Sequence, residues 1–418
     1  NIDIFKFLVN KVPLSRIVSL LEISWSVLYN RIDFIHQQCL AFAADREREL
    51  QTLAIPKLYL AVDRQNYEVN WTERKDRRNI VLSAMASADN LTGYVFGVHP
   101  NFDFTLDNTQ IEQDAIAIGD AALAAPFRKY ARLWLQADYQ KSVQASASKG
   151  RWVPSTLTGT IAAKYAQTAQ RDDIEAFDSK TKEEKLPSYG CQVKAEYTMI
   201  AHFYFLKSLM GNVQKWRFFL DQESGIRSAC LSGFKQEVAN HTAEAFYVSI
   251  QKELTVDQKR RLKTAANQRI LEEKKNHPTL SDPEIKLQLL KQQINAVTHL
   301  GSWKDKWVQH PFPSMSEPAK AMCWLTEHQG LDPDHQAWLY DKASLHAVDS
   351  FFQKIRRRMA MFERAIHSQG NHGRTWNGYA AYNPAMVVKM LDIFRVVHNY
   401  IDTRKDGLFD LVAMNEYR

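Results

Sequence analysis

Two aspartates each close an apolar run of the sequence. Asp63 ends LYLAVD and Asp221 ends WRFFLD. Strand interiors disfavour Asp, so a carboxylate at such a position needs a reason. The simplest reason for either residue alone is a turn or a helix N-cap. If both strands belong to one sheet, the two carboxylates could meet, and divalent cations with oxygen ligands would relieve their repulsion. Two such metals can activate an attacking oxygen and stabilise a leaving oxygen on phosphorus.

This chemistry usually needs a third carboxylate, and the C-terminal third of the chain offers two. Asp349 lies in HAVDSFFQKIRRR, and Glu363 follows 14 residues later in AMFERAI. On one helix that separation is about 21 Å, so both acids cannot reach one metal pair. Arg356 stands seven residues after Asp349 on the same helical face, where a carboxylate and a cation could hold a metal and a nearby phosphate. The corresponding position after Glu363 is Gly370. Asp349 is therefore the preferred third acid and Glu363 the alternative.

The elements that must position these acids alternate between strands and helices. Strands are expected over KLYLAVDRQ, RRNIVLSAMASAD, TGYVFGVHPNF, KWRFFLDQ and AEAFYVSIQ, with a hairpin turn at residues 89–93. Helices are expected over EYTMIAHFYFLKSLMG, GIRSACLSGFKQEV, ASLHAVDSFFQKIRRRMAMFERAI and NPAMVVKMLDIFRVVHNYI. Residues 108–188 are typical of a helical insertion. Residues 255–335 are typical of a second one, in which residues 255–310 carry 11 Lys and Arg against 6 Asp and Glu.

The first 55 residues favour a helix-turn-helix. Apolar residues recur at helical spacing over residues 14–21, and Ser24 is expected to cap a second helix over residues 25–35. The second helix of such a motif enters the major groove of DNA. Candidate DNA contacts on it are Ser26, Tyr29, Asn30 and Arg31. An ordinary helical hairpin is the alternative. Because the sequence begins with Asn rather than Met, a preceding segment is expected.

Composition excludes several classes of protein. With 45% hydrophobic and 11% aromatic residues, a chain of 418 residues can bury a sizeable core. No apolar run reaches the length of about 18 residues that a membrane span needs. The four cysteines are scattered without a CxxC pair, which favours neither a disulfide framework nor a zinc site and suits the cytoplasm. The formal net charge of +7 is compatible with a polyanionic partner.

The order of these features resembles the DDE-type transposases of bacterial insertion sequences. AVDRQ and FLDQESGIR are similar to the segments that carry the first and second acids of that family, and RVVHNYI is similar to its closing helix. HAVDSFFQKIRRRMAMFERAI is similar to the helix that carries the third acid, a cation seven residues later and a basic residue near its end, here Asp349, Arg356 and Arg364. The resemblance covers the core segments and not the two insertions. The third acid of the family is usually Glu, and the acids here are further apart in sequence than in its compact members.

The resemblance implies an α/β fold, with a ribonuclease H-like mixed five-stranded sheet flanked by helices, large helical insertions and an N-terminal helix-turn-helix. The expected division of the chain is 1–55 for the helix-turn-helix, 56–107 and 189–254 for two parts of the core, 108–188 and 255–335 for the insertions, and 336–418 for the C-terminal core helices with the third acid.

The resemblance also implies a DNA transposase. Asp63, Asp221 and Asp349 would hold two Mg²⁺ ions, with Mn²⁺ able to substitute. Water activated there would hydrolyse a phosphodiester at the end of a mobile element, and the freed 3′-hydroxyl would attack target DNA. Cations expected to contact backbone phosphates are Arg227, Arg356, Arg357, Arg358 and Arg364, with an ordinary surface salt bridge as the alternative for the first.

The expected partners are double-stranded DNA and a second copy of the chain, as a homodimer or higher oligomer on DNA in the bacterial cytoplasm at the nucleoid, without a membrane. Two alternatives stay open. One is a transposase-derived DNA-binding protein without catalysis, and the other is a two-metal nuclease that cuts DNA without joining it.

Overall fold

A mixed β-sheet forms the centre of the protein. The computed structural model describes residues 1–146, 156–169, 179–223, 225–251, 254–301, 303–363, 376 and 378–402. The strands within them are β1 (Leu58–Val69), β2 (Ile80–Asp89), β3 (Val95–Pro100), β4 (Phe102–Asp103), β5 (Cys191–Gln192), β6 (Trp216–Asp221), β7 (Ala243–Ile250), β8 (Thr298–Leu300), β9 (Asp305–Gln309) and β10 (Lys320–Trp324). Eight of these strands form the main sheet in the order β3-β2-β1-β6-β7-β10-β9-β8, and β4 pairs with β5 separately.

The strands of the main sheet run in both directions. β1 is antiparallel to β2 and parallel to β6, β2 is antiparallel to β3, and β6 is parallel to β7. β10 is antiparallel to β7 and β9, and β9 is antiparallel to β8. All five strands expected from the sequence are present, and the hairpin turn at residues 89–93 joins β2 to β3. The class is α/β, as expected, but the described residues give a sheet of eight strands rather than five.

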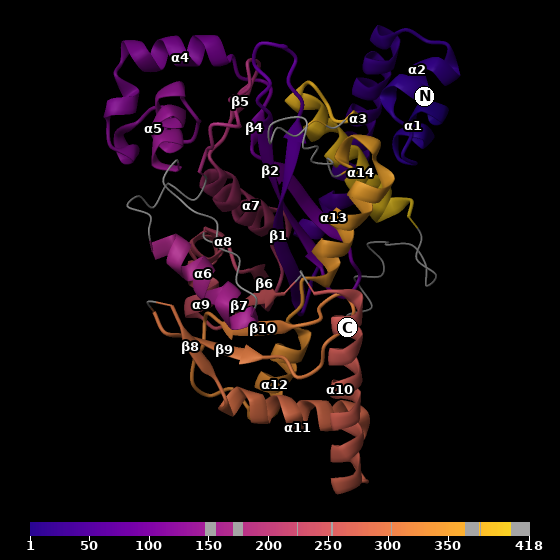
Figure 1. The fold of residues 1–418 in the computed structure, drawn as a ribbon, viewed down its shortest axis with the longest axis vertical. Coiled ribbons are helices and arrows are strands. Elements are labelled where there is room, and N and C mark those ends of the chain that lie inside the picture. The colour runs from indigo at the N-terminus through magenta and orange to yellow at the C-terminus, as the bar shows by residue number, and fades with distance from the viewer. Residues whose placement is uncertain are drawn as a thin grey trace.

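Helices lie on both sides of this sheet (Figure 1). They are α1 (Ile2–Leu8), α2 (Leu14–Leu21), α3 (Trp25–Glu47), α4 (Asn108–Ala117), α5 (Gln136–Ser146), α6 (Leu157–Ala169), α7 (Ala195–Leu209), α8 (Ile226–Gly233), α9 (Lys235–Ala239), α10 (Val256–Asn276), α11 (Asp282–Asn295), α12 (Pro333–Lys342), α13 (His346–Arg358) and α14 (Pro384–Tyr400), with 3₁₀ turns η1 (Arg48–Gln51), η2 (Asp120–Ala122), η3 (Ala125–Phe127) and η4 (Ala360–Phe362). In the described part of the chain, none of these helices is long and apolar enough to cross a bilayer.

The two faces of the sheet build separate hydrophobic cores. Tyr59 and Ala61 of β1 belong to the core shared with α13 and α14, whereas Leu60 and Val62 belong to the core shared with α7 and α8. This alternation has the period of two expected of a strand that is buried on both faces. In Figure 1, α3, α13 and α14 lie on one side of the sheet, and α6, α7 and α8 lie on the other.

The N-terminal helices pack on the core of the domain. α3 runs without interruption to Glu47, beyond residue 35, where the expected second helix ends. Its buried residues, Leu28 among them, share the core of α14. Ser24 caps α3 as expected, because its side chain accepts a hydrogen bond from the backbone N–H of Val27. α2 and α3 thus follow each other as in a helix-turn-helix while contributing to the main core.

A buried ion pair fastens α3 to α14. Arg395 donates to the carboxylate of Glu47, which also accepts a hydrogen bond from the Tyr94 hydroxyl at 2.8 Å. Glu47 and Arg395 are only 7% and 9% exposed. The Arg395→Met variant is therefore expected to lose about 3 kcal/mol of unfolding free energy, because Glu47 stays buried without its partner. Urea unfolding measures this loss, with Arg48→Met at an exposed ion pair as the control that changes little. Equal stability of Arg395→Met and the wild type would contradict the prediction.

Both insertions contain more than long helices. In residues 108–188, α4 ends at Ala117, and Gly119, with a φ of 66°, turns the chain into η2. Residues 255–335 include the long helices α10 and α11, but also β8, β9 and β10, which extend the main sheet beyond β7. The sequence did not predict these three strands.

The C-terminal helices also differ from expectation in their length. α14 confirms the helix expected over NPAMVVKMLDIFRVVHNYI. The expected helix around Asp349, by contrast, is shorter than the pattern suggested: α13 ends at Arg358, where Met359 adopts an extended backbone, and η4 follows. The stretch GIRSACLSGFKQEV similarly divides into α8 and α9.

Candidate active site

Asp63 and Asp221 lie on adjacent, parallel strands. In the register of β1 and β6, Val62 pairs with Leu220, so each aspartate follows one of two paired residues. β6 ends at Asp221, whereas β1 continues to Val69 through its pairing with β2. Asp63 therefore lies in the middle of its strand, not at its end as the sequence suggested, but at the level where the neighbouring strand stops. Adjacent strands are about 4.8 Å apart, so the two acids occupy neighbouring positions in the strand register.

Asp63 belongs to the sheet face that α13 covers. Ala61 and Tyr67 of β1 lie in the core on that side, and side chains two residues apart on a strand share a face. Asp221 is the last residue of β6, and its carboxylate lies 3.6 Å from Lys164 of α6, a helix that packs in the core on the other side of the sheet. Asp63 is only 7% exposed, and the Asp221 side chain is 19% exposed. The two acids are therefore neighbours in strand register and largely withdrawn from water.

The backbone of Arg64 and the side chain of Lys164 contact these acids. The Arg64 backbone N–H donates to Asp63 Oδ1 at 2.7 Å, and Arg64 Nε donates to Glu223 Oε2 at 2.8 Å. This Arg64–Glu223 ion pair ties the chain that follows β6 to β1. On the other side, Lys164 Nζ of α6 lies 3.6 Å from Asp221 Oδ2. Asp63 is thus bound by a backbone amide, and Asp221 by a lysine of the first insertion.

α13 runs alongside β1 and in the same direction. Near the start of α13, the Asn90 side-chain amide donates to the Ser344 carbonyl at 2.8 Å. The Asn90 backbone N–H in turn donates to the Tyr59 carbonyl of β1 at 2.8 Å. Near the end of α13, the Arg356 guanidinium donates to Gln65 Oε1 of β1. The helix therefore follows the strand from the level of Tyr59 to that of Gln65.

This course places Asp349 beside the middle of β1. Asp349 precedes Arg356 by seven residues, which is about 10 Å of helix rise. About three residues of a strand cover the same distance. Counted back from Gln65, which contacts Arg356, they place Asp349 at the level of Ala61 to Asp63. Among the residues that the structure describes, however, no three His, Cys, Asp or Glu side chains are grouped so as to hold a metal ion. Two acids of the expected triad are neighbours, and the third lies on the helix beside them without closing the group.

The buried Tyr67 hydroxyl responds to the charges on this face of β1. Burial is the largest influence and raises the pKa of Tyr67, whereas the positive charge of Arg356 and a hydrogen bond with Gln65 lower it. The negative charge of Asp63 raises the pKa further. The Tyr67 hydroxyl is therefore influenced by both Asp63 and Arg356. Arg356 thus lies in the same electrostatic environment as Asp63.

Glu363, the alternative third acid, lies outside α13. The helix ends at Arg358 and η4 intervenes, so the two candidate acids do not share one helix as expected. The Glu363 side chain is 42% exposed, and its Oε1 lies 2.9 Å from Lys11 Nζ. Glu363 thus takes part in an ion pair with the N-terminal segment.

The arginines expected to contact phosphates differ in the contacts they make. Arg227 Nη1 lies 2.7 Å from Asp305 Oδ2 in a salt bridge whose side chains are only 20% and 10% exposed, so it is not the surface salt bridge given as its alternative. Arg358 donates to a carboxylate at the end of α14 at 2.7 Å. Arg357 is exposed. Arg364 lies outside the described residues.

The four expected DNA contacts near the N-terminus lie on one part of α3. Ser26, Tyr29, Asn30 and Arg31 are all exposed. Trp25 is also exposed, and its ring stacks on Tyr29 with 6.0 Å between the ring centroids. The start of α3 therefore presents hydroxyl, amide, guanidinium and aromatic groups to solvent.

Sequence reasoning missed two charged residues beside the acids. Glu223 lies only two residues after Asp221, so its position in the motif FLDQES was a signal that could have been weighed. Lys164 carries no comparable signal, because it stands in an ordinary helical stretch, IAAKYAQ, of the first insertion. Only the fold brings it to Asp221.

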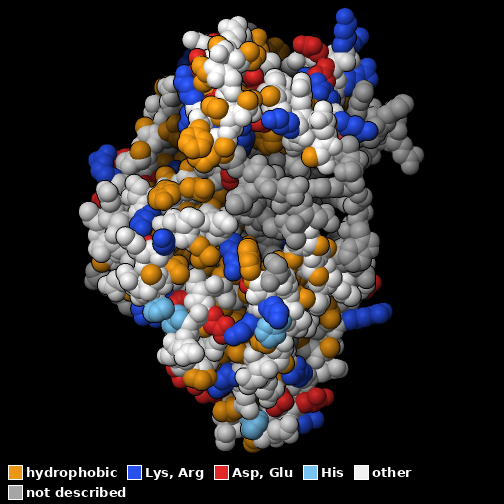
Figure 2. Space-filling model, turned by 90° about the vertical axis from the view of Figure 1, so that its left-hand side faces the viewer, with side chains coloured by type: hydrophobic (Ala, Val, Ile, Leu, Met, Phe, Trp, Pro, Cys, Tyr) orange, Lys and Arg blue, Asp and Glu red, His pale blue; other side chains and the backbone are white. Residues whose placement is uncertain are grey.

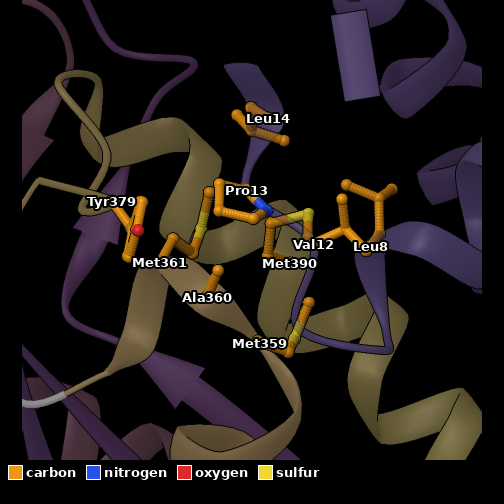
Figure 3. Close-up of a pocket in the computed structure, with 9 residues that line it drawn as sticks. All are labelled: Leu8, Val12, Pro13, Leu14, Met359, Ala360, Met361, Tyr379 and Met390. Atoms are coloured by element: carbon orange, nitrogen blue, oxygen red, sulfur yellow. The ribbon is translucent and has the colours of Figure 1, made fainter. Parts of the chain in front are cut away.

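A pocket between the N-terminal segment and η4 has apolar walls (Figure 3). It is lined by Leu8, Val12, Pro13, Leu14, Met359, Ala360, Met361, Tyr379 and Met390. These side chains include no carboxylate, imidazole or cation, and the phenol of Tyr379 is the ionisable group among them. The lining of this pocket therefore differs chemically from the acidic Asp63–Asp221 site.

The face that carries α4 to α6 is mixed in charge. In Figure 2, its Lys and Arg side chains are interspersed with acidic and hydrophobic ones. Lys129 pairs with Asp114 at 2.6 Å, and Arg128 pairs with Asp138 at 2.8 Å. Much of the positive charge in the outer part of this insertion is therefore matched within it.

Comparison with known proteins adds no relative. No family model matches the chain, and no curated protein or solved structure is significantly similar to it.

Proposed function

We propose that the protein is a DNA transposase that uses Mg²⁺ to cut a phosphodiester at the end of a mobile element and to join the freed 3′-hydroxyl to target DNA. The observation that carries this proposal is the register of β1 and β6, which gives Asp63 and Asp221 neighbouring positions on adjacent parallel strands. These acids are remote in sequence, and two carboxylates at low exposure suit a site at which a divalent cation would offset their charge.

The order of the strands supports a ribonuclease H-like core. The five strands β3, β2, β1, β6 and β7 are adjacent in the sheet, and β2 alone runs against the other four. They are the five strands expected for that core, and helices pack on both faces. In this proposal β10, β9 and β8 are an extension of the core contributed by the second insertion.

The side chains at the site suit hard divalent cations. Mg²⁺ is commonly held by one or two carboxylates together with substrate phosphates, and Asp63 and Asp221 supply two such carboxylates. Bound there, two Mg²⁺ ions would supply Lewis acidity at the reacting phosphodiester. Asp349 is the proposed third ligand, because α13 carries it along the same strand. Arg356, held at Gln65, is proposed to position a backbone phosphate.

The start of α3 is the proposed reader of the element end. Its exposed amide and guanidinium groups, Asn30 and Arg31, are side chains that pair with base edges in the major groove. Because α3 is tied to α14 through Glu47 and Arg395, DNA held on α3 would have a fixed position relative to the acids. The protein is proposed to act as a dimer or larger assembly on paired ends.

Labelled duplexes that carry the DNA flanking the coding sequence of this protein test the proposal. They are incubated with the protein and a target plasmid, in Mg²⁺ or in EDTA. The proposed function predicts cut ends with free 3′-hydroxyls and joined products, both only in Mg²⁺. Cut ends without joined products would indicate a nuclease, and binding without cleavage would indicate a DNA-binding protein. The absence of binding would reject all three functions.

A further inference from the structure

The second insertion carries a long helix with no buried residue. α10 runs from Val256 to Asn276 and packs chiefly on α11. In Figure 1, it extends below α11 at the bottom of the molecule. A helix that is exposed along its whole length is expected to be stabilised by many ion pairs between its own turns. The distribution of charge on α10 differs from this expectation.

Four cations are concentrated near the start of α10, in the run KRRLK at residues 259–263. Lys259, Arg260 and Lys263 lie on one face, because residues three and four positions apart are neighbours on a helix. Arg260 pairs with Asp257 at 3.8 Å, and these side chains are 71% and 81% exposed. In the described part of the chain, Lys259 and Lys263 form no ion pair. The positive charge of this face is therefore largely unmatched there.

The other end of α10 is balanced in charge. Lys274 and Lys275 directly follow two acids, Glu272 and Glu273. Lys274 Nζ also lies 2.6 Å from Asp282 Oδ1, in the first turn of α11. The two ends of one helix thus carry the same kind of cation in opposite surroundings. The excess of positive charge, which attracts anions, lies at the start.

Helix stability does not explain the charge at the start of α10. Lys259 and Lys263 are four residues apart, where like charges destabilise a helix. The helix begins nearby because Thr255 and Gln258 cap it. The Thr255 hydroxyl accepts from the Gln258 backbone N–H at 3.3 Å, and Gln258 Oε1 accepts from the Thr255 backbone N–H at 2.8 Å. A polyanion bound across this face would offset the repulsion between the two lysines.

The fold brings the start of α10 to the edge of the sheet where the candidate acids lie. β7 is parallel to β6, and Val248 of β7 pairs with Asp221. β7 ends at Ile250, and α10 begins six residues later. Six residues span at most about 20 Å. Through α11, whose Leu290 lies in the core shared with α13, α10 is attached to the side of the sheet that carries Asp63.

We infer that the basic face at the start of α10, formed by Lys259, Arg260 and Lys263, binds backbone phosphates of double-stranded DNA next to the candidate active site. This inference rests on the proposed function, which makes DNA the substrate. A duplex supplies a closely spaced row of negative charges, about one for every 1.7 Å of its axis. Contacts of Lys and Arg with phosphates fix the position of a duplex without reading its sequence. α10 thus holds DNA of any sequence, whereas α3 reads the element end.

The salt dependence of DNA binding tests this inference without relying on catalysis. Binding of a fluorescein-labelled duplex to the full chain is followed by anisotropy over a series of salt concentrations, in EDTA so that no strand is cut. Loss of two phosphate contacts in the double variant Lys259→Gln/Lys263→Gln is expected to make the slope of log K against log salt shallower by about 1.8. The same change is expected with flanking DNA and with a scrambled duplex of equal length, because backbone contacts do not depend on sequence.

Lys274→Gln/Lys275→Gln is the matched control, because it makes the same substitutions in the same helix and removes the same charge. Its slope is expected to equal that of the wild type. Lys259→Arg/Lys263→Arg is also expected to keep the wild-type slope, because it keeps the charge. An unchanged slope in Lys259→Gln/Lys263→Gln, an equal change in the control, or a change with flanking DNA alone would overturn the inference.

Thermal unfolding separates lost contacts from lost structure. Lys259→Gln/Lys263→Gln removes a repulsion between helical neighbours, so it is expected to unfold at no lower temperature than the wild type. Failure of the inference also differs from failure of the proposed function. If the wild type cleaves DNA in Mg²⁺ while Lys259→Gln/Lys263→Gln keeps the wild-type slope, the inference alone fails. If the wild type binds neither duplex, the proposed function fails, and the inference fails with it.

Discussion

Replacing either Asp63 or Asp221 by Asn is expected to abolish Mg²⁺-dependent strand cleavage and leave DNA binding nearly intact. Asn keeps the shape of the side chain but loses the negative charge that holds a divalent cation. The lost stabilisation of charge at the reacting phosphate amounts to several kcal/mol, or a fall in rate of about a thousandfold or more. The folded state is expected to lose little stability, because the ion pair between Asp221 and Lys164 is partly exposed and the amide oxygen of the Asp63→Asn side chain can still accept the hydrogen bond from the backbone N–H of Arg64.

The cleavage assay with flanking DNA measures this loss, and anisotropy measures binding in parallel. Glu68→Gln is the matched control, because Glu68 is an exposed acid of the same strand, β1. It is expected to cleave like the wild type. Equal loss of DNA binding in the Asp63→Asn and Asp221→Asn variants would argue that the acids have a structural role, and wild-type cleavage in either would reject that acid as a metal ligand.

The sequence was sufficient to predict the centre of the fold because its signals there are local. LYLAVD and WRFFLD are apolar runs of strand length, and both proved to be neighbouring strands. The position of Asp63 within β1 was harder to predict. Residues after Asp63 are largely polar, RQNYEV, yet pairing with β2 continues the strand to Val69. Only the partner strand, which lies further along the chain, decides where β1 ends.

The features that were not predicted depend on contacts between distant segments. β10, late in the second insertion, pairs with β7, which precedes that insertion, and the short run KAMCW gives no local sign of joining the main sheet. α3 continues past residue 35 because its later turns pack against α14, near the other end of the chain. Lys164 reaches Asp221 for a similar reason, since α6 is held by Asp305 and Trp307 of the second insertion.

The end of α13 separates the two candidates for the third acid. On a single long helix, Asp349 and Glu363 would both lie beside the sheet, at different levels along β1. Because α13 stops at Arg358, only Asp349 lies on the helix that follows β1, and the contact between Arg356 and Gln65 fixes its height. Glu363 lies beyond η4 and pairs with Lys11.

The Asp349→Ala variant is therefore expected to lose strand cleavage by about a hundredfold or more, as expected for removal of one ligand of a metal site, whereas Glu363→Ala is expected to keep it. An exposed ion pair such as Lys11–Glu363 contributes at most about 1 kcal/mol to stability, so Glu363→Ala should also unfold near the wild-type temperature. Cleavage rates of both variants are compared in Mg²⁺ with the same flanking duplexes. Unchanged cleavage in Asp349→Ala together with loss in Glu363→Ala would transfer the role of third acid to Glu363, and it would require the chain after η4 to approach β1 when DNA is bound.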